Sequence, residues 1–294
     1  MFTVLIVTGV IVGAQQPTFQ TAIDLVNIGV TVTDKKGKLV TDLTAGDFEV
    51  TEGGRKQTLS YFAAGDQVGP DLHLGLLLDV SGSMGEDIGF TRTAAIKFLN
   101  TLTDAVDITV VDFDTQVRVG RYGQSEFARL VERIRQQKTD GNTALYDAIG
   151  LYLDGAAGQT GRKIMLLYTD GGDTRSVLRF DELLNLLKAS DTTVYAIGQL
   201  EHQTQASKGA QRPILQRIAE TTGGEAFFPL SVTDLDAVYD KVIAEIRAQY
   251  TLGYLSTNDK LDGGWRKVEI KIVRRDGREY RVRSRKGYYA LYKP

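Results

Sequence analysis

The sequence has no cysteine and only two histidines, His73 and His202, among its 294 residues. The absence of cysteine excludes disulfides, thiolate metal sites and cysteine nucleophiles. Two histidines leave little material for a His-rich metal site or a Ser-His-Asp triad. The chain also has no large excess of positive or negative charge. It has 35 Lys and Arg and 37 Asp and Glu, which gives a net charge of −2. The total charge therefore indicates no particular class of partner.

The N-terminal run lacks charge altogether. Residues 2–14 are apolar or small, and "VGA" followed by Gln15 is similar to a small-x-small cleavage site. The run is too short to span a bilayer comfortably. We therefore predict a signal peptide over residues 1–14, a secreted or periplasmic (cell-envelope) protein, and no transmembrane span in the mature chain. No basic residue precedes the run, since the first lysine is Lys35, and a buried strand or a tail is the alternative.

The middle of the chain alternates between two patterns. Apolar runs typical of buried strands fall at 74–80, 107–113, 163–169 and 192–200, with a short second strand predicted at 117–119. Between them lie runs with helical spacing at 87–102, 125–137, 143–153, 180–190, 214–224 and 234–250. This order predicts an α/β fold, a doubly wound and mostly parallel sheet with helices on both faces, over residues 70–248. Ligands of such sheets bind at the carboxyl ends of the strands.

Both ends of the chain have strand signals and no helix signals. We expect one β segment at 24–68 and another at 249–294, with a hairpin turn at "RDG" (275–277). The two segments either form one smaller β-sandwich or pack as separate arms. Alternation places Arg281, Arg283 and Arg285 on one face of a strand. We interpret that face as solvated, and we expect no nucleic-acid partner because no aromatic-basic motif accompanies it.

Polar side chains lie where three of the predicted segments begin or end. Asp79 lies at the end of the strand at 74–80 and Ser81 and Ser83 follow it, Thr143 lies in "DGNTALYD" at the start of a helix, and Asp170 directly follows the strand at 163–169. Together they offer two carboxylates and three hydroxyls, all hard oxygen donors, which suit Mg²⁺ or Mn²⁺. Two carboxylates leave the ion electrophilic toward a further anionic oxygen. The pattern thus predicts a metal site that accepts a carboxylate from a protein partner.

These three pieces, "DVSGSM", "GNTALYD" and "YTDGGDT", resemble the three loops of a metal-ion-dependent adhesion site in the von Willebrand factor type A (VWA) family. The flanks at 29–62 and 250–290 resemble those of a VWFA-related group of secreted bacterial proteins. The resemblance implies a Rossmann-like VWA fold with an intact metal motif. It assigns Asp79, Ser81 and Ser83 to the first loop of the site, Thr143 to the second and Asp170 to the third.

Neighbouring residues have less specific interpretations. Asp147 is expected to brace the loop that holds Thr143. Asp173 and Arg175 either line the rim of the ligand site or form a turn. The polar stretch at 199–212 is interpreted as a surface loop that can contribute to specificity.

The first functional hypothesis is a non-enzymatic, metal-dependent binding or adhesion module. The alternatives are a Mg²⁺-dependent hydrolase or phosphotransferase with Asp79 as nucleophile, and an envelope assembly scaffold. An aspartyl-phosphate enzyme usually has a second acid two residues later, where this chain has Ser81. No P-loop and no Gly-x-Ser-x-Gly elbow is present. The sequence leaves the ligand's identity and the oligomeric state open.

Overall fold

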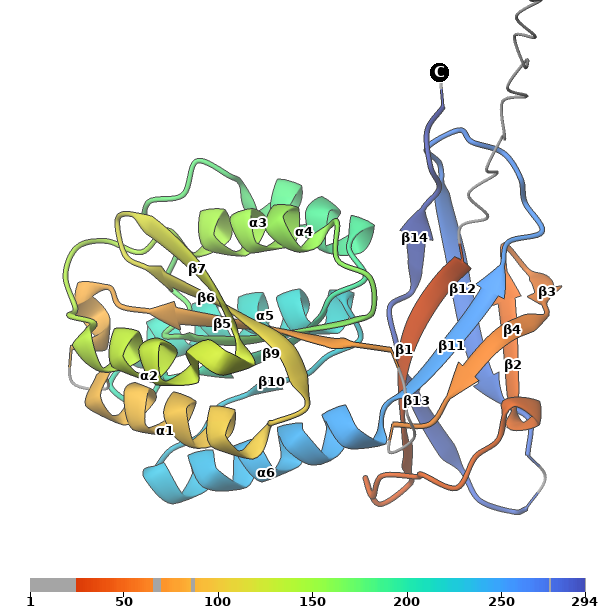
Figure 1. The fold of residues 1–294 in the computed structure, drawn as a ribbon, viewed down its shortest axis with the longest axis horizontal. Coiled ribbons are helices and arrows are strands. Elements are labelled where there is room, and N and C mark those ends of the chain that lie inside the picture. The colour runs from red at the N-terminus through yellow and green to blue at the C-terminus, as the bar shows by residue number, and fades with distance from the viewer. Residues whose placement is uncertain (1–24, 66–69, 86–87, 275, 294) are drawn as a thin grey trace, which may run out of the picture.

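The central unit is built on a six-stranded sheet in the order β10-β9-β8-β5-β6-β7 (Figure 1). The computed structural model describes residues 25–65, 70–85, 88–274 and 276–293, so the predicted signal segment lies outside the described residues. The strands are parallel except β7, which pairs antiparallel with β6. Their bounds are β5 Leu72–Asp79, β6 Ala105–Phe113, β7 Val117–Gly123, β8 Arg162–Thr169, β9 Thr193–Gly198 and β10 Ala226–Phe227.

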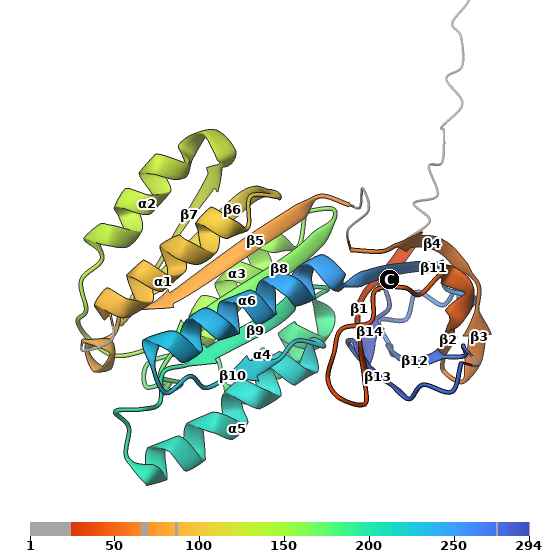
Figure 2. The same cartoon turned by 90° about the horizontal axis from the view of Figure 1, so that it is seen from below.

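Helices cover both faces of this sheet (Figure 2). On one face α1 (Ile88–Thr101), α2 (Phe127–Gln136) and α6 (Val232–Ala248) enclose a core that includes Leu76 and Phe98. On the other face α3 (Leu145–Ala156), α4 (Phe180–Ala189) and α5 (Gln205–Thr221) pack over Leu77. Alternate residues of β5 therefore serve different cores, which explains its unbroken apolar run. The predicted doubly wound α/β fold is confirmed.

Helix α5 corrects one expectation. The stretch 199–212 was predicted to be a loop, yet the helix begins at Gln205 and continues past Pro213 to Thr221. The Thr204 side chain caps it by accepting a hydrogen bond from the Ser207 N–H at 3.2 Å. Its first turns carry polar residues on exposed positions, so they lack the apolar spacing by which helices are predicted.

A glycine on the central strand allows α3 to approach closely. A Cβ on Gly75 would lie 2.2 Å from the Tyr152 ring, which is fully buried. We expect Gly75→Ala to lower the free energy of unfolding by about 1–3 kcal/mol, because the surrounding core is close-packed and the ring has no room to shift. Gly155→Ala on the same helix is the matched control, since nothing lies within 4 Å of its added Cβ. Urea denaturation should show the first variant destabilised and the control unchanged or more stable.

The two ends of the chain form a second unit of two antiparallel four-stranded sheets. One sheet has the order β13-β1-β11-β4, the other β14-β12-β2-β3, and both draw strands from each end of the chain. The smaller β-sandwich predicted from the terminal segments is therefore present. Its strands are β1 Leu25–Asp34, β2 Phe48–Glu52, β3 Arg55–Gln57, β4 Leu59–Ala63, β11 Tyr250–Leu255, β12 Trp265–Ile272, β13 Tyr280–Arg283 and β14 Gly287–Tyr289.

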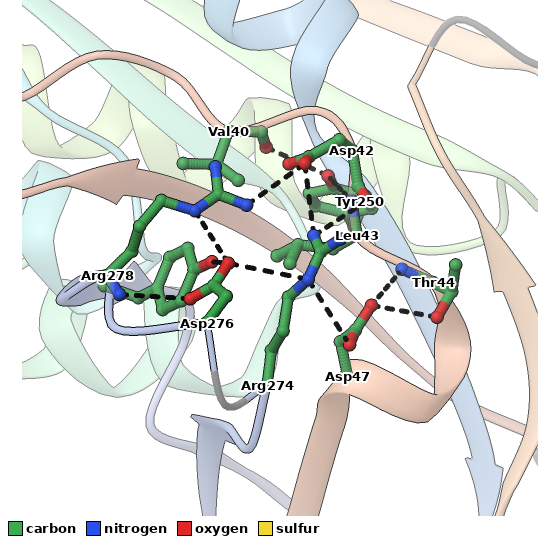
Figure 3. A network of polar contacts seen from close by, with 10 residues as sticks. Val40, Asp42, Leu43, Thr44, Asp47, Tyr250, Arg274, Asp276 and Arg278 are labelled. Atoms are coloured by element: carbon green, nitrogen blue, oxygen red, sulfur yellow. Dashed lines mark hydrogen bonds and ion pairs between the residues drawn. The ribbon is translucent and has the colours of Figure 1, made fainter.

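The hairpin predicted at 275–277 includes residue 275, which lies outside the described residues. The strands before and after this segment, β12 and β13, belong to different sheets and do not pair with each other, so the hairpin prediction was wrong. Figure 3 shows what holds the segment: Asp276 accepts hydrogen bonds from Tyr280 and Arg278, and Arg274 and Arg278 both reach Asp42. These contacts keep the pKa of Asp276 well below its usual range. The network ties the crossover to the loop that follows β1.

The sandwich packs at the amino edge of the parallel sheet, where β5 begins and α6 ends (Figure 2). The arginine face that we expected to be solvated, with Arg283 and Arg285, lies at this junction. The Arg283 guanidinium pairs with Glu225 and with Glu245, whose carboxyl is buried in α6, and Arg285 donates to Asn27 O at 2.6 Å. The prediction of a solvated face is therefore wrong for both arginines. No helix in the described ranges combines the length and apolarity needed to cross a membrane.

Candidate functional site

The last residue of β5, Asp79, places a carboxylate at the carboxyl edge of the sheet, opposite the sandwich. Asp79 is completely buried. Its carboxylate accepts hydrogen bonds from the Ser81 N–H at 3.0 Å and from Thr169 Oγ1 at 2.6 Å. Burial, with a smaller contribution from the nearby charge of Asp170, raises the pKa of Asp79 to about 7. No Lys or Arg of the described residues pairs with it, so the carboxylate lacks a compensating positive charge.

The two serines of this loop face each other. Ser81 Oγ and Ser83 Oγ are 3.2 Å apart, with Ser81 buried and Ser83 exposed. Gly82 N–H donates to Gly141 O at 3.1 Å, which fastens this loop to the one that carries Thr143. Gly141 has a φ of +72°, a conformation that favours glycine. The two loops are thus held together by main-chain contacts.

Thr143 lies just before α3 and is buried. Its N–H donates to Thr174 Oγ1 at 3.0 Å, and its carbonyl accepts from the N–H groups of Thr174 at 2.9 Å and Arg175 at 3.0 Å. The second loop is therefore clasped by the third one, which follows Asp170. All three loops meet at one edge of the sheet.

Asp170 follows β8 and is also buried. Its Oδ2 accepts a hydrogen bond from Gln203 Nε2 at 2.9 Å, and its Oδ1 accepts one from Gly172 N at 3.3 Å. Both donors are neutral, so they orient the carboxylate without cancelling its charge. Gln203 was not identified from the sequence; the signal available was its place just after β9, at the same edge as the other loops.

Asp147 and Asp173 turn inward and fix the third loop. Asp147 accepts from the N–H groups of Val177 and Leu178, each at 2.9 Å. Asp173 accepts from the Tyr146 N–H at 3.2 Å and from Ser176 Oγ at 2.6 Å. Asp147 thus binds the loop after Asp170, whereas the sequence suggested only the loop of Thr143. Arg175 is exposed.

The side chains at this edge fit a hard divalent cation. The donors are two buried carboxylates and three hydroxyls, and Asp79 would gain the positive charge that it lacks. Across the described ranges, no three Asp, Glu, His or Cys side chains gather in a way that could hold a metal ion. An ion here would therefore depend on neutral hydroxyl oxygens beside the two carboxylates, and as a hard Lewis acid it could still accept a further anionic oxygen.

A doubly wound sheet with hydroxyl and carboxylate loops at its carboxyl edge defines a class of α/β binding domains. The model of the von Willebrand factor type A domain matches residues 73–243, and the chain belongs to this family. No curated protein matches the chain.

Three solved structures show similar folds. The PilB minor pilin from Streptococcus sanguinis has a TM-score of 0.52 at 13% identity, covering 62% of this chain and 62% of that one. The pilus adhesin SpaC from Lactobacillus rhamnosus GG, in an open conformation, has a TM-score of 0.51 at 11% identity, covering 83% of this chain and 48% of that one. A von Willebrand factor type A protein from Catenulispora acidiphila has a TM-score of 0.50 at 14% identity, covering 84% of this chain and 74% of that one. The chain thus spans about three fifths of the pilin's length, and at these identities the likeness concerns the fold.

Proposed function

We propose that this protein is a metal-dependent binding module that attaches to a protein partner through a partner carboxylate. Asp79, Ser81, Ser83, Thr143 and Asp170 would hold Mg²⁺ or Mn²⁺, through an intact adhesion motif of the family. The observation that carries the proposal is the fully buried Asp79 carboxylate, which has no cationic partner and lies beside a pair of hydroxyls. When bound, the ion supplies a Lewis-acidic position for an anionic oxygen.

The chain's own residues favour binding over catalysis. The Asp79 oxygens accept hydrogen bonds from Ser81 and Thr169 inside the protein, so the carboxylate is poorly placed to act as a nucleophile. His73 lies on β5 near its amino end, bound to Asp107 and to Thr160 O, and is remote from the site as a base. Pilin and adhesin folds among the similar structures support an adhesive role.

We extend the proposal to the organisation of the chain. The VWA domain takes residues 70–248, and the β segments 24–68 and 249–294 form the unit that carries it. A secreted or cell-envelope location would suit an adhesive role, and attachment to an envelope assembly is one form that such binding could take. The similarity to pilus proteins supports this location.

Selection from a displayed peptide library in Mg²⁺ tests the function. We expect binders that are eluted by EDTA and that share an Asp or Glu whose change to Asn or Gln abolishes binding. Thr143→Ala, which removes one hydroxyl ligand, should lower the recovery of these peptides, whereas Thr93→Ala in α1, an exposed hydroxyl, should not. Binders that persist in EDTA, or that contain no acidic residue, would contradict the proposal.

A further inference from the structure

The loop from Asp170 to Arg179 is fixed by an unusual density of contacts. The N–H groups of Thr174 and Arg175 bond to Thr143 O, and those of Val177 and Leu178 bond to the Asp147 carboxylate. The side chains of Thr174, Asp173 and Ser176 also turn inward, onto the N–H groups of Thr143, Tyr146 and Asp147 respectively. This loop is therefore held in one conformation from its inner side.

Two side chains on the outer side of this loop take no part in these contacts. Arg175 is exposed, and the ion pairs found on this segment among the described residues involve Arg179 and not Arg175. Val177 is 90% exposed, more than any other large apolar side chain in the described part of the chain. A cation and an apolar group are thus presented by a fixed backbone. Isolated exposed valines are common on surfaces, but here the N–H groups of Val177 and of the next residue both bond to the Asp147 carboxylate.

The position of Arg175 relates it to the metal site. Its own N–H lies 3.0 Å from the carbonyl of Thr143, one of the five proposed ligands. The backbone of Arg175 is therefore fixed next to the loop that carries Thr143, and its exposed guanidinium can bind a second carboxylate, for which its planar fork is suited. Asp173 cannot share this role, because its carboxylate already accepts from Tyr146 and Ser176. Of the two residues considered for the rim, only Arg175 remains available.

We infer that Arg175 and Val177 form a second subsite, and that the partner segment carries two acidic residues and an apolar one. The inference rests on the proposed function: the first acid binds the metal, the second binds Arg175, and the apolar side chain covers Val177. In an extended segment alternate residues lie on one side, roughly 7 Å apart. We therefore assign the acids to the first and third positions and the apolar residue to the fifth, because Arg175 is bonded to Thr143 through its N–H and Val177 lies two residues further along the loop.

Synthetic peptides test the subsite directly. The probes are G-D-G-E-G-L-G and the matched G-D-G-Q-G-L-G, titrated against the full chain in Mg²⁺ and again in EDTA. We expect the wild type to bind the Glu peptide about tenfold more tightly than the Gln peptide. In Arg175→Gln this ratio should fall to about one, while Mg²⁺ affinity and the affinity for the Gln peptide stay unchanged. Arg179→Gln is the control, because that guanidinium is exposed and already pairs with Glu182.

The variant Val177→Ser tests the apolar part of the subsite independently of Arg175. It should weaken both peptides several-fold, and it should have no effect on a peptide in which Leu is replaced by Gly. Equal binding of the Glu and Gln peptides to the wild type, or a ratio unchanged in Arg175→Gln, would overturn the subsite while leaving the proposed function standing. Failure of every Asp-containing peptide to bind in Mg²⁺, or equal binding in EDTA, would overturn the proposed function and the subsite with it.

Discussion

Replacing Asp79 with asparagine is expected to abolish the response of this protein to divalent ions without unfolding it. Wild-type protein in Mg²⁺ at a hundredfold excess over its dissociation constant should gain about 2.7 kcal/mol of stability, and the variant should gain none. Asparagine keeps the shape and can still accept from the Ser81 N–H, but it lacks the charge. Calorimetric titration with Mg²⁺ and thermal unfolding with and without the ion measure the two quantities.

The variant should also be at least as stable as the wild type when no metal is present. The reason is that an ionised carboxylate buried without a counter-charge opposes folding, as the raised pKa of Asp79 shows. Asp154→Asn on the exposed side of α3 is the control and should keep the full ion response. A metal-free Asp79→Asn protein that is markedly less stable than the wild type would mean that the carboxylate serves the fold rather than an ion.

The second large effect is expected at the junction between the two units. Arg283→Met removes the cation that faces Glu245, whose carboxyl is only 2% exposed. The uncompensated charge should lower the free energy of unfolding by about 3–5 kcal/mol in urea denaturation. Arg281→Met, two residues earlier on the same strand and exposed, should change it little. The double variant Arg283→Met with Glu245→Leu should recover most of the loss.

The loss should depend on pH in a defined direction. Burial raises the pKa of Glu245, and Arg283 opposes this shift. A carboxyl with a folded-state pKa above its unfolded value loses stability as pH rises between the two values. Without Arg283 the folded-state pKa of Glu245 should rise further, so the destabilisation of Arg283→Met should be small near the ordinary glutamate pKa of about 4.5 and should grow as pH rises above it. Two results would contradict the account of a buried ion pair. One is a loss of stability in Arg283→Met that does not depend on pH, and the other is a double variant that is less stable than Arg283→Met alone.

The α/β architecture could be predicted because two features of the sequence indicate each strand, its apolar run and the residues that bound it. An unbroken apolar run such as that of β5 can only be buried on both faces, and glycines and polar residues bound each run. The helices with an apolar stripe were found to within a few residues. The first turns of α5 were missed because they are exposed and polar, so nothing in the pattern distinguished them from a loop. Capping by Thr204 was the remaining signal.

Contacts between segments that are distant in the sequence could not be predicted from such local patterns. The side of β13 that faces α6 carries charge, and alternation alone cannot tell a solvated arginine from one that meets a buried glutamate. The sequence at 275–277 has the composition of a hairpin turn, yet the strands before and after it belong to different sheets. At the site, the residue types predicted the donors, whereas the hydrogen bond from Gln203 to Asp170 depends on how the loop after β9 folds back.

Diffraction from crystals soaked in Mn²⁺, measured at a wavelength where manganese scatters anomalously, tests the central claim most directly. We predict one anomalous peak at the carboxyl edge of the sheet, surrounded by oxygens of Asp79, Ser81, Ser83, Thr143 and Asp170, and with a remaining coordination position open to solvent. Asp79→Asn crystals treated identically should show no peak. The absence of manganese from this edge at millimolar concentration, or a fully enclosed ion with no accessible position, would contradict the account.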